Sequence, residues 1–300
     1  MKNKYLFIGD LESINLEIIC KSQKYLKRKV KYIIICNIKE VKTSLKKLTF
    51  ERKLKEVLDP LNFSSIDEDS LNLFNIENIS KKKYVNLLNQ LTVSNYLSNI
   101  TKFDLITMPI NKSLFKKNMA FNGITEYLGK LNNKKTKMLM YGENFSVLPI
   151  TTHINPKKIH LKIKSNFLKK EIIEILNYIN NYKKLLKIRK IKFLCYNPHC
   201  GEDSTMGLED QIIKKVIRNF KLIEGPYPAD SAFNKFHKNS LYISSYHDQG
   251  LIPFKILNTK GINLTLGLDY LRMSPAHGTA EDIKYKNKSN NASYLECMIF

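Results

Sequence analysis

Three histidines lie in three short polar signatures, and each signature follows or ends an apolar run that is typical of a buried strand. They are His153 in residues 151–153, His199 in residues 197–202 and His247 in residues 246–250. Imidazoles delivered from three strand ends can converge on one metal ion and leave coordination positions open for a substrate. The pattern therefore predicts a catalytic metal site rather than a structural one.

The neighbours of these histidines strengthen the prediction, because a single histidine at a strand end is more often a structural residue. Pro198 ends a strand sharply, and Gly201 and Gly250 permit tight turns close to a ligand. Asp248 adjoins His247, where its carboxylate could orient a ligand histidine, bind metal or act as a general base. The alternative for Asp248 is a helix N-cap.

Further polar residues follow on later segments. Asp230 lies in a proline-braced loop, residues 225–231, which could also be a simple turn. Lys255, Asn263 and Arg272 follow His247 along the chain. A lysine, an amide and an arginine supply charge and directional donors for a phosphate or a carboxylate, although each of them alone is typical of a surface.

The segments that must position these residues alternate between strands and helices. Apolar, β-branched runs predict strands, and the spacing of apolar residues predicts helices at about 14–27, 167–188 and 208–220. This alternation predicts an α/β architecture with a largely parallel sheet, whose ligands bind at the carboxyl ends of the strands. Residues 40–100 show no clear pattern. The strand predictions fall at residues 5–8, 32–36, 105–107, 191–195, 241–244 and 262–265.

The composition limits the classes of function. The formal net charge of +23 invites a nucleic-acid-binding function, but the lysines are spread along all 300 residues without a recognised motif. We favour a solvated basic surface, whose field would still attract an anionic substrate, and expect no specific nucleic acid partner. No apolar run is long enough for a membrane helix. Five cysteines without metal-site spacing favour reduced thiols and a cytoplasmic protein.

With these residues assembled, the sequence resembles the 4-hydroxythreonine-4-phosphate dehydrogenase family of pyridoxal phosphate biosynthesis. The order and spacing of the motifs agree from about residue 103 to the C-terminus, and a fainter match extends to Gly9-Asp10. The matching motifs lie in residues 109–112, 123–128, 151–153, 197–202, 225–230, 246–251, 263–268, 272–274 and 277–283.

The resemblance implies an isocitrate-dehydrogenase-like α/β/α fold of two domains, with a mostly parallel sheet and an interdomain cleft. It implies a first domain of residues 1–116 plus 284–300, and a second domain of residues 117–283 that carries the metal histidines and the dimer contacts. It also implies a homodimer in which residues are donated across the interface to the active site.

The resemblance assigns roles to particular residues. His153, His199 and His247 would bind a divalent metal such as zinc, magnesium or cobalt. Thr125, Lys112, Lys255, Asn263 and Arg272 would bind the phosphorylated substrate. His277, Gly278 and Thr279 resemble a loop that binds the nicotinamide cofactor, NAD or NADP. Asp248, Asp230 and Lys255 are candidates for the general base, and the sequence does not rank them.

The activity that the resemblance implies is oxidation and decarboxylation of 4-phosphohydroxy-L-threonine to 3-amino-2-oxopropyl phosphate. The chain departs from the family at several positions. Ile124 replaces a histidine that usually contacts the substrate, Ala276 replaces an aspartate, and Asp203-Ser204 replaces a glycine pair. These changes leave two alternatives open, namely a dehydrogenase of another phosphorylated hydroxy acid and a non-catalytic protein that binds metal or nucleic acid.

Overall fold

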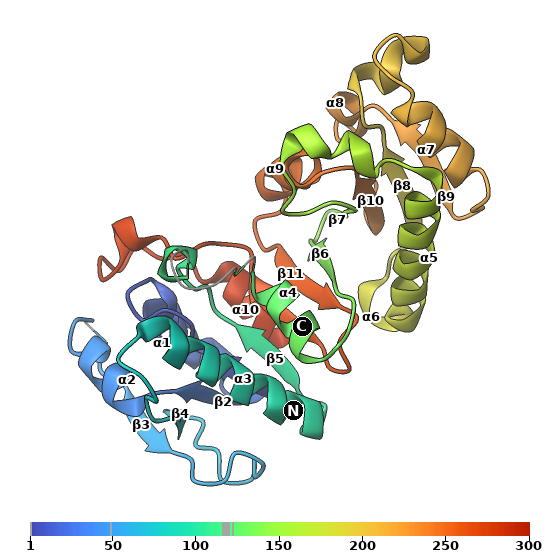
Figure 1. Cartoon of the computed structure of the whole chain (residues 1–300). Coiled ribbons are helices and arrows are strands. Elements are labelled where there is room, and N and C mark those ends of the chain that lie inside the picture. The colour runs from blue at the N-terminus through green and yellow to red at the C-terminus, as the bar shows by residue number, and fades with distance from the viewer. Residues whose placement is uncertain (1, 49, 116–120, 122) are drawn as a thin grey trace. The chain divides into compact units, whose positions relative to one another are not determined.

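A computed structural model of the chain describes residues 2–48, 50–115, 121 and 123–300. The chain divides into two compact units (Figure 1). The first unit contains Met1–Thr136 and Ile262–Phe300, and the second unit contains Lys137–Gly261. Each unit is an α/β structure, and each is described separately below.

The sheet of the first unit is parallel except for one antiparallel pair among its described strands. Its order is β3-β4-β2-β1-β5-β12-β11, and only β11 and β12 run antiparallel to each other. In the central strands the apolar residues are consecutive, Tyr5 to Phe7 in β1 and Tyr32 to Cys36 in β2, because both faces of the sheet are covered there. The strands are β1 (Lys2–Phe7), β2 (Val30–Cys36), β3 (Lys53–Glu56), β4 (Ser70–Asn75), β5 (Asp104–Thr107), β11 (Ile262–Leu266) and β12 (Arg272–Pro275).

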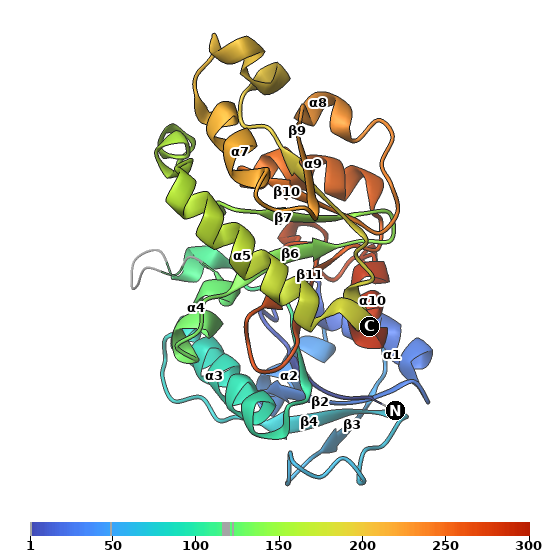
Figure 2. The same ribbon diagram turned by 90° about the vertical axis from the view of Figure 1, so that its right-hand side faces the viewer.

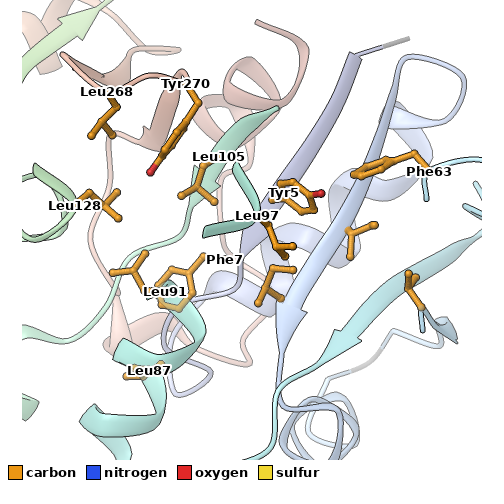
Figure 3. Close-up of a cluster of buried hydrophobic side chains, with 13 residues drawn as sticks. Tyr5, Phe7, Phe63, Leu87, Leu91, Leu97, Leu105, Leu128, Leu268 and Tyr270 are labelled. Carbon is orange, nitrogen blue, oxygen red and sulfur yellow. The ribbon is translucent and has the colours of Figure 1, made fainter. Parts of the chain in front are cut away.

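Helices cover both faces of this sheet. On one face, α3 (Lys83–Thr101) and α4 (Ile124–Leu131) pack against β1, β2 and β5 through an apolar cluster (Figure 3). The cluster includes Leu91 of α3, Leu128 of α4 and Leu105 of β5. On the other face lie α1 (Asn15–Leu26) and α10 (Ala292–Ile299), and α2 (Ile38–Leu45) contacts α1 and β4 (Figure 2). The first unit is therefore a three-layer α/β/α structure.

The sheet of the second unit has the order β6-β7-β10-β8-β9, again with one antiparallel pair among the described strands, β6 with β7. Helix α9 contacts β7 and β10, while α7 contacts β9 and α5. In Figure 1 these helices lie on opposite sides of the strands. The elements are β6 (Lys137–Tyr141), β7 (Ser146–Pro149), α5 (Ser165–Asn181), α6 (Lys183–Leu186), β8 (Lys190–Leu194), α7 (Glu209–Ile217), β9 (Ile223–Tyr227), α8 (Ala229–Ala232), β10 (Ser240–Ser244) and α9 (His247–Leu257).

The α/β class and the mostly parallel sheet that we predicted are confirmed. All six predicted strands are present, and α1 and α7 occupy two of the predicted helical segments. The predicted helix at 167–188 is two helices, α5 and α6, because the backbone leaves the helical conformation at Tyr182, where φ is −104° and ψ is 17°. The interdomain cleft stays a prediction.

The units divide at residues 136/137 and 261/262, whereas the expected domain boundaries lie at 116/117 and 283/284. The packing explains the difference. Leu128 of α4, together with Leu268 and Tyr270 of the segment between β11 and β12, belongs to the apolar cluster of the first unit (Figure 3). These segments therefore fold with the first unit. No helix among the described residues is long and apolar enough to span a membrane.

Candidate active site

The three histidine signatures lie at one edge of the second unit. Strands β7, β10 and β8 are adjacent and parallel, so their carboxyl ends meet at the same edge. His153 follows the end of β7, His199 follows β8, and His247 is the first residue of α9 after β10. The sequence prediction of polar residues at neighbouring strand ends is correct for these three positions.

His153 and His247 are neighbours. Their ring centroids lie 5.9 Å apart, with an angle of 36° between the ring planes. Two imidazoles that bind one ion through nitrogens about 2 Å away from it have centroids roughly 5–6 Å apart, so this spacing suits two ligands of one metal. Nδ1 of His247 lies 2.6 Å from Oδ1 of Asp248, a contact that orients the ring and leaves Nε2 available for coordination.

His199 lies on an exposed turn with an unusual backbone. From His199 to Ser204 every φ is positive, between 40° and 82°, so the chain forms a left-handed turn that costs about 1–2 kcal/mol for each residue other than glycine. The glycine pair of the resembling family is replaced here by Asp203 and Ser204, which both have this conformation. Strain of this kind is common at functional sites.

The described residues supply only part of the expected metal centre. They contain no group of three or more His, Cys, Asp or Glu side chains that could hold a metal ion. The donor pair His153 and His247 suits a metal, but His199 does not complete a three-ligand group with them in the single chain. The three-histidine metal site therefore stays a prediction.

A side-chain hydrogen-bond network ties the three strand ends together. The amide of Gln249 accepts from Ser245 N at 2.9 Å and donates to the carbonyl of Cys195, at the end of β8, at 2.6 Å. Thr151 Oγ1 donates to the carbonyl of Ser245 at 2.6 Å. This network, the strand-end clasp of Thr151, Ser245, Gln249 and Cys195, holds the segments that carry the three histidines.

Asp210 supports the same edge from α7. Its buried carboxylate accepts hydrogen bonds from the backbone N–H groups of Tyr196 and Asn197, at 2.6 and 2.9 Å. The sequence did not point to Gln249 or Asp210 as parts of the site. Gln249 stands inside the 246–250 signature, which is the signal that could have found it, whereas Asp210 has only its place in the first turn of a helix.

A second polar cluster lies in the first unit around Arg272, whose side chain is buried although it is charged. Its exposed fraction is 2%. The guanidinium donates to the hydroxyls of Thr107, Thr125 and Thr265: Nε lies 2.9 Å from Thr107 Oγ1, and Nη1 lies 3.1 Å from Thr125 Oγ1 and 2.9 Å from Thr265 Oγ1. Nη2 also donates to Thr107. We call these four residues the Arg272 cage.

The Arg272 cage holds a buried positive charge on neutral groups. Burial lowers the pKa of the Arg272 guanidinium to about 10, and the carboxylate of Glu126, which is close enough to act on this charge without forming an ion pair within the described part of the chain, offsets the burial only in part. Burying a charge without a partner is costly, so an anion that entered the cage would relieve that cost. The arrangement is what a binding site for phosphate or carboxylate requires.

The other predicted substrate residues of the first unit lie on nearby elements. Thr125 is in the first turn of α4, where a helix N-terminus favours an anion. Asn263 is in β11, and its Oδ1 atom is buried without a hydrogen-bond partner among the described residues. Lys112 is exposed in the short turn after β5. Ile124 packs against the apolar cluster of this unit.

The predicted cofactor loop follows β12 in the same unit. His277 Nδ1 lies 2.9 Å from the carbonyl of Gly278, so Nδ1 carries the proton and Nε2 is an acceptor. Nε2 is buried without a partner among the described residues, and burial lowers the pKa of His277. A side chain at Gly278 would have open space, because no atom lies within 4 Å of where its Cβ would be. The loop is anchored by a hydrogen bond from Ile14 N to the carbonyl of Thr279, at 3.2 Å. An anchored loop with an unpaired acceptor and open space fits a ligand-binding role.

The remaining candidates belong to the second unit. Asp230 is exposed on α8, Asp248 is exposed at the start of α9, and Lys255 is exposed in the last turn of α9. Of the three candidate bases, Asp248 is paired with His247. The substrate residues that the sequence predicted are thus divided, with Lys255 in the second unit and Thr125, Lys112, Asn263 and Arg272 in the first.

Mostly parallel sheets with polar groups at strand ends and a buried cation are typical of α/β enzymes that act on small molecules. The family model described as pyridoxal phosphate biosynthetic protein PdxA matches residues 13–300. The chain therefore belongs to this family, whose curated members are oxidoreductases. The family that the sequence resembles is confirmed.

Two curated relatives are named 4-hydroxythreonine-4-phosphate dehydrogenase. The protein from Aquifex aeolicus (strain VF5) is 34% identical over 311 residues, covering 97% of this chain and 94% of that protein. The protein from Hydrogenobaculum sp. (strain Y04AAS1) is 45% identical over 186 residues, covering 61% of this chain and 59% of that protein.

A solved structure supports the fold. The 4-hydroxythreonine-4-phosphate dehydrogenase from Klebsiella pneumoniae aligns with a TM-score of 0.82 at 24% identity, covering 100% of this chain and 98% of that chain. A β-decarboxylating dehydrogenase from Thermococcus kodakarensis aligns with a TM-score of 0.50 at 11% identity, covering 99% of this chain and 82% of that chain. At these identities the likeness concerns the fold alone.

Proposed function

We propose that the chain oxidises 4-phosphohydroxy-L-threonine, with NAD or NADP as the hydride acceptor, in pyridoxal phosphate biosynthesis. The β-keto acid formed then loses carbon dioxide to give 3-amino-2-oxopropyl phosphate. Membership of the PdxA family supports the reaction. The observation on which the proposal depends most is the Arg272 cage, a buried guanidinium that is held by hydroxyl groups and forms no ion pair among the described residues.

In this proposal the residues of the first unit hold the substrate and the cofactor. Arg272 and Thr125 bind the phosphate, and Lys112 and Asn263 are proposed as further substrate residues of the same unit. Lys255 of the second unit is proposed as a further substrate residue. The loop of His277, Gly278 and Thr279 binds the nicotinamide cofactor, and the unpaired Nε2 of His277 accepts a hydrogen bond from it.

The edge of the second unit where the three histidine signatures lie, called the histidine edge below, is proposed to hold a divalent metal such as zinc, magnesium or cobalt. The ligands would be His153, His247 and His199. A bound cation would stabilise the negative charge that develops on the substrate hydroxyl oxygen. Asp248, Asp230 and Lys255 remain the candidates for the base that takes the hydroxyl proton. Asp248 is paired with His247 at 2.6 Å, a position that also suits orientation of the imidazole.

We further propose a cytoplasmic homodimer. If residues of one copy complete the site of the other, a second copy would supply the third ligand that the described residues of one chain do not bring to His153 and His247. Sedimentation velocity with and without zinc tests this arrangement. A species of twice the chain mass is expected, and a monomer at micromolar concentration would contradict it.

The test of the reaction is formation of NADH from 4-phosphohydroxy-L-threonine by the purified protein with added divalent metal. Turnover is expected in the wild-type protein and should be lost in His199→Ala, whose circular dichroism spectrum should be unchanged. An exposed histidine outside the signatures, His160, gives the matched control His160→Ala, which should retain turnover. A wild-type protein without any turnover would show the proposal to be wrong.

A second candidate is oxidation of a different phosphorylated hydroxy acid. It is favoured by Ile124, which packs against apolar side chains at a position where the family has a histidine that contacts the substrate. An isoleucine side chain cannot form a hydrogen bond, so a substrate with a less polar group near α4 would fit better. A panel of phosphorylated 2- and 3-hydroxy acids decides between the two, because preference for 4-phosphohydroxy-L-threonine removes the second candidate.

A further inference from the structure

Two residues of the Arg272 cage have no role in the function proposed above. Thr107, the last residue of β5, and Thr265 of β11 are both fully buried, with 0% of their surface exposed. Thr107 Oγ1 accepts from both Nε and Nη2 of Arg272, and Thr265 Oγ1 accepts from Nη1. A guanidinium that is bonded on three nitrogens cannot rotate, so its position is fixed by these two hydroxyls.

The hydroxyl of Thr265 also determines what Thr125 can do. Thr265 Oγ1 and Thr125 Oγ1 lie 3.3 Å apart, and either could donate to the other. A hydroxyl has one proton, and a buried hydroxyl needs an acceptor for it. Among the described residues the acceptor that Thr265 reaches is Thr125, because its other partner is the Arg272 cation. Thr265 therefore donates to Thr125.

Thr125 then accepts two hydrogen bonds, one from Thr265 and one from Nη1 of Arg272. Its two lone pairs are used, so its own proton is free to be donated. Thr125 is half-buried, whereas Thr107 and Thr265 are closed off from solvent, so the proton of Thr125 is the one that a ligand can reach. The cage offers a donor and a cation together, which suits the acceptor oxygens of a phosphate.

We propose that Thr107 and Thr265 are positioning residues of the phosphate site. Thr107 fixes the guanidinium of Arg272 without neutralising its charge, and Thr265 turns Thr125 into an obligate hydrogen-bond donor. A carboxylate in place of either threonine would pair with Arg272 and repel a phosphate. This inference rests on the proposed function only in taking the ligand to be a phosphate group.

The first test measures binding of inorganic phosphate through the rise in melting temperature that it causes. Sodium chloride at equal ionic strength corrects for screening of the high net charge. The wild-type protein is expected to gain several degrees in phosphate relative to chloride. Thr265→Val, which keeps the shape and removes the hydroxyl, is expected to lose at least half of this gain, and Thr265→Ser is expected to keep it.

Two further variants separate positioning from general damage. Thr107→Ser keeps the acceptor oxygen and is expected to retain the phosphate-dependent gain even if the melting temperature in chloride falls. Thr43→Val removes an exposed hydroxyl on α2 that is bonded only to the carbonyl of Lys39, and it serves as the matched control with an unchanged gain. Equal phosphate-dependent gains in wild type and Thr265→Val would overturn the proposal, as would the absence of any gain in wild type.

The second test uses turnover of 4-phosphohydroxy-L-threonine. Thr265→Val is expected to raise KM about tenfold, with kcat within about threefold of wild type, because a charge-assisted hydrogen bond to the phosphate is weakened. Thr265→Ser should restore KM. An unchanged KM in Thr265→Val overturns the positioning role while leaving the proposed reaction intact. A wild-type protein without turnover, but with a phosphate-dependent gain that needs Thr265, supports the positioning role and refutes the reaction.

Discussion

The two units differ in how deeply their candidate functional side chains are buried. In the first unit the charge of Arg272 is built into the core, where three threonine hydroxyls hold it and its exposed fraction is 2%. In the second unit His153 and His199 are exposed on loops, and His247 is half-buried at the start of a helix. The position of the Arg272 charge, the proposed anion site, is therefore fixed by packing alone. In the second unit the histidine edge depends on the strand-end clasp, and among the described residues its histidine signatures do not form a group of three metal ligands.

This difference in burial indicates which candidate residues can be replaced without loss of the fold. Replacing an exposed histidine leaves the core intact, so function and stability separate easily in the second unit. Replacing a buried cage residue changes packing and charge together, so the two are coupled in the first unit. The predictions below use this contrast, from the largest expected effect to the smallest.

The largest effect is expected for Arg272→Met. Removing a buried guanidinium that contacts a ligand anion costs about 2–5 kcal/mol, so kcat/KM for the phosphorylated substrate should fall by roughly thirtyfold to several-thousandfold. The stability of the protein should fall as well, by about 1–3 kcal/mol, because the buried hydroxyls of Thr107 and Thr265 lose their donor, although methionine avoids the desolvation cost of the guanidinium. Arg189→Met, at an exposed arginine, is the control. A large loss of stability with a small loss of activity would mean that Arg272 serves the fold and not the ligand, and would contradict this prediction.

The next effect concerns the histidine pair. His153→Ala and His247→Ala are each expected to weaken zinc binding at least tenfold, with equal sizes because the two rings are neighbours. Competition with a chromogenic chelator measures the affinity. The urea midpoint without metal should hardly move, because His153 is exposed and His247 is only half-buried. His160→Ala should bind zinc as the wild type does, and a matching loss in that variant would show that the pair is not the zinc site.

A smaller effect is expected for Gln249→Ala in the strand-end clasp. The change leaves Ser245 N and the carbonyl of Cys195 without their partners, which should cost about 1–2 kcal/mol in the free energy of unfolding. Gln249→Glu should cost more, because its carboxylate would face a carbonyl oxygen. Gln211→Ala, at an exposed glutamine, should cost under about 0.5 kcal/mol. Equal losses in Gln249→Ala and Gln211→Ala would mean that the clasp does not stabilise this edge.

The smallest effect is a pH dependence in the first unit. Hydrogen bonds from Lys284 and Lys47 lower the pKa of Glu12 from 4.5 to about 2. The stability that Glu12 contributes is therefore present above pH 4.5 and is lost as the pH falls towards 2. The carboxylate is partly exposed, so solvent screening limits this contribution to about 1 kcal/mol or less. Unfolding curves of wild type and Glu12→Gln should differ most near pH 6 and converge near pH 2, and a constant difference would contradict this assignment.

Much of the fold could be predicted because its signals are local. Residues 5–8 and 32–36 are apolar, as expected for strands covered on both faces, and they fall mostly within β1 and β2. The spacing of apolar residues in α5 identifies its buried side. The segment 40–100 gave no such signal. It contains β3, in which Lys53–Glu56 show no alternation of apolar and polar residues. It also contains most of α3, where asparagine and serine make up half of the buried residues and so weaken the apolar pattern of a helix.

The candidate site was predictable only where its residues are marked by their neighbours in sequence. The histidine signatures at the ends of β7, β8 and β10 were found in this way. The Arg272 cage was not, because Thr107 lies 165 positions from Arg272 and nothing in a strand-end threonine indicates such a contact. The left-handed turn at His199 was also not predicted, because Glu202, Asp203 and Ser204 rarely adopt positive φ.

The central claim is that the buried charge of the first unit recognises a phosphate on a hydroxy-acid substrate. The most direct measurement is the ratio of kcat/KM for 4-phosphohydroxy-L-threonine to that for unphosphorylated 4-hydroxy-L-threonine, in wild type and in Arg272→Met. A ratio of at least about a hundred in wild type, falling at least tenfold in Arg272→Met, is the predicted result. A ratio that is the same in both proteins would contradict the claim.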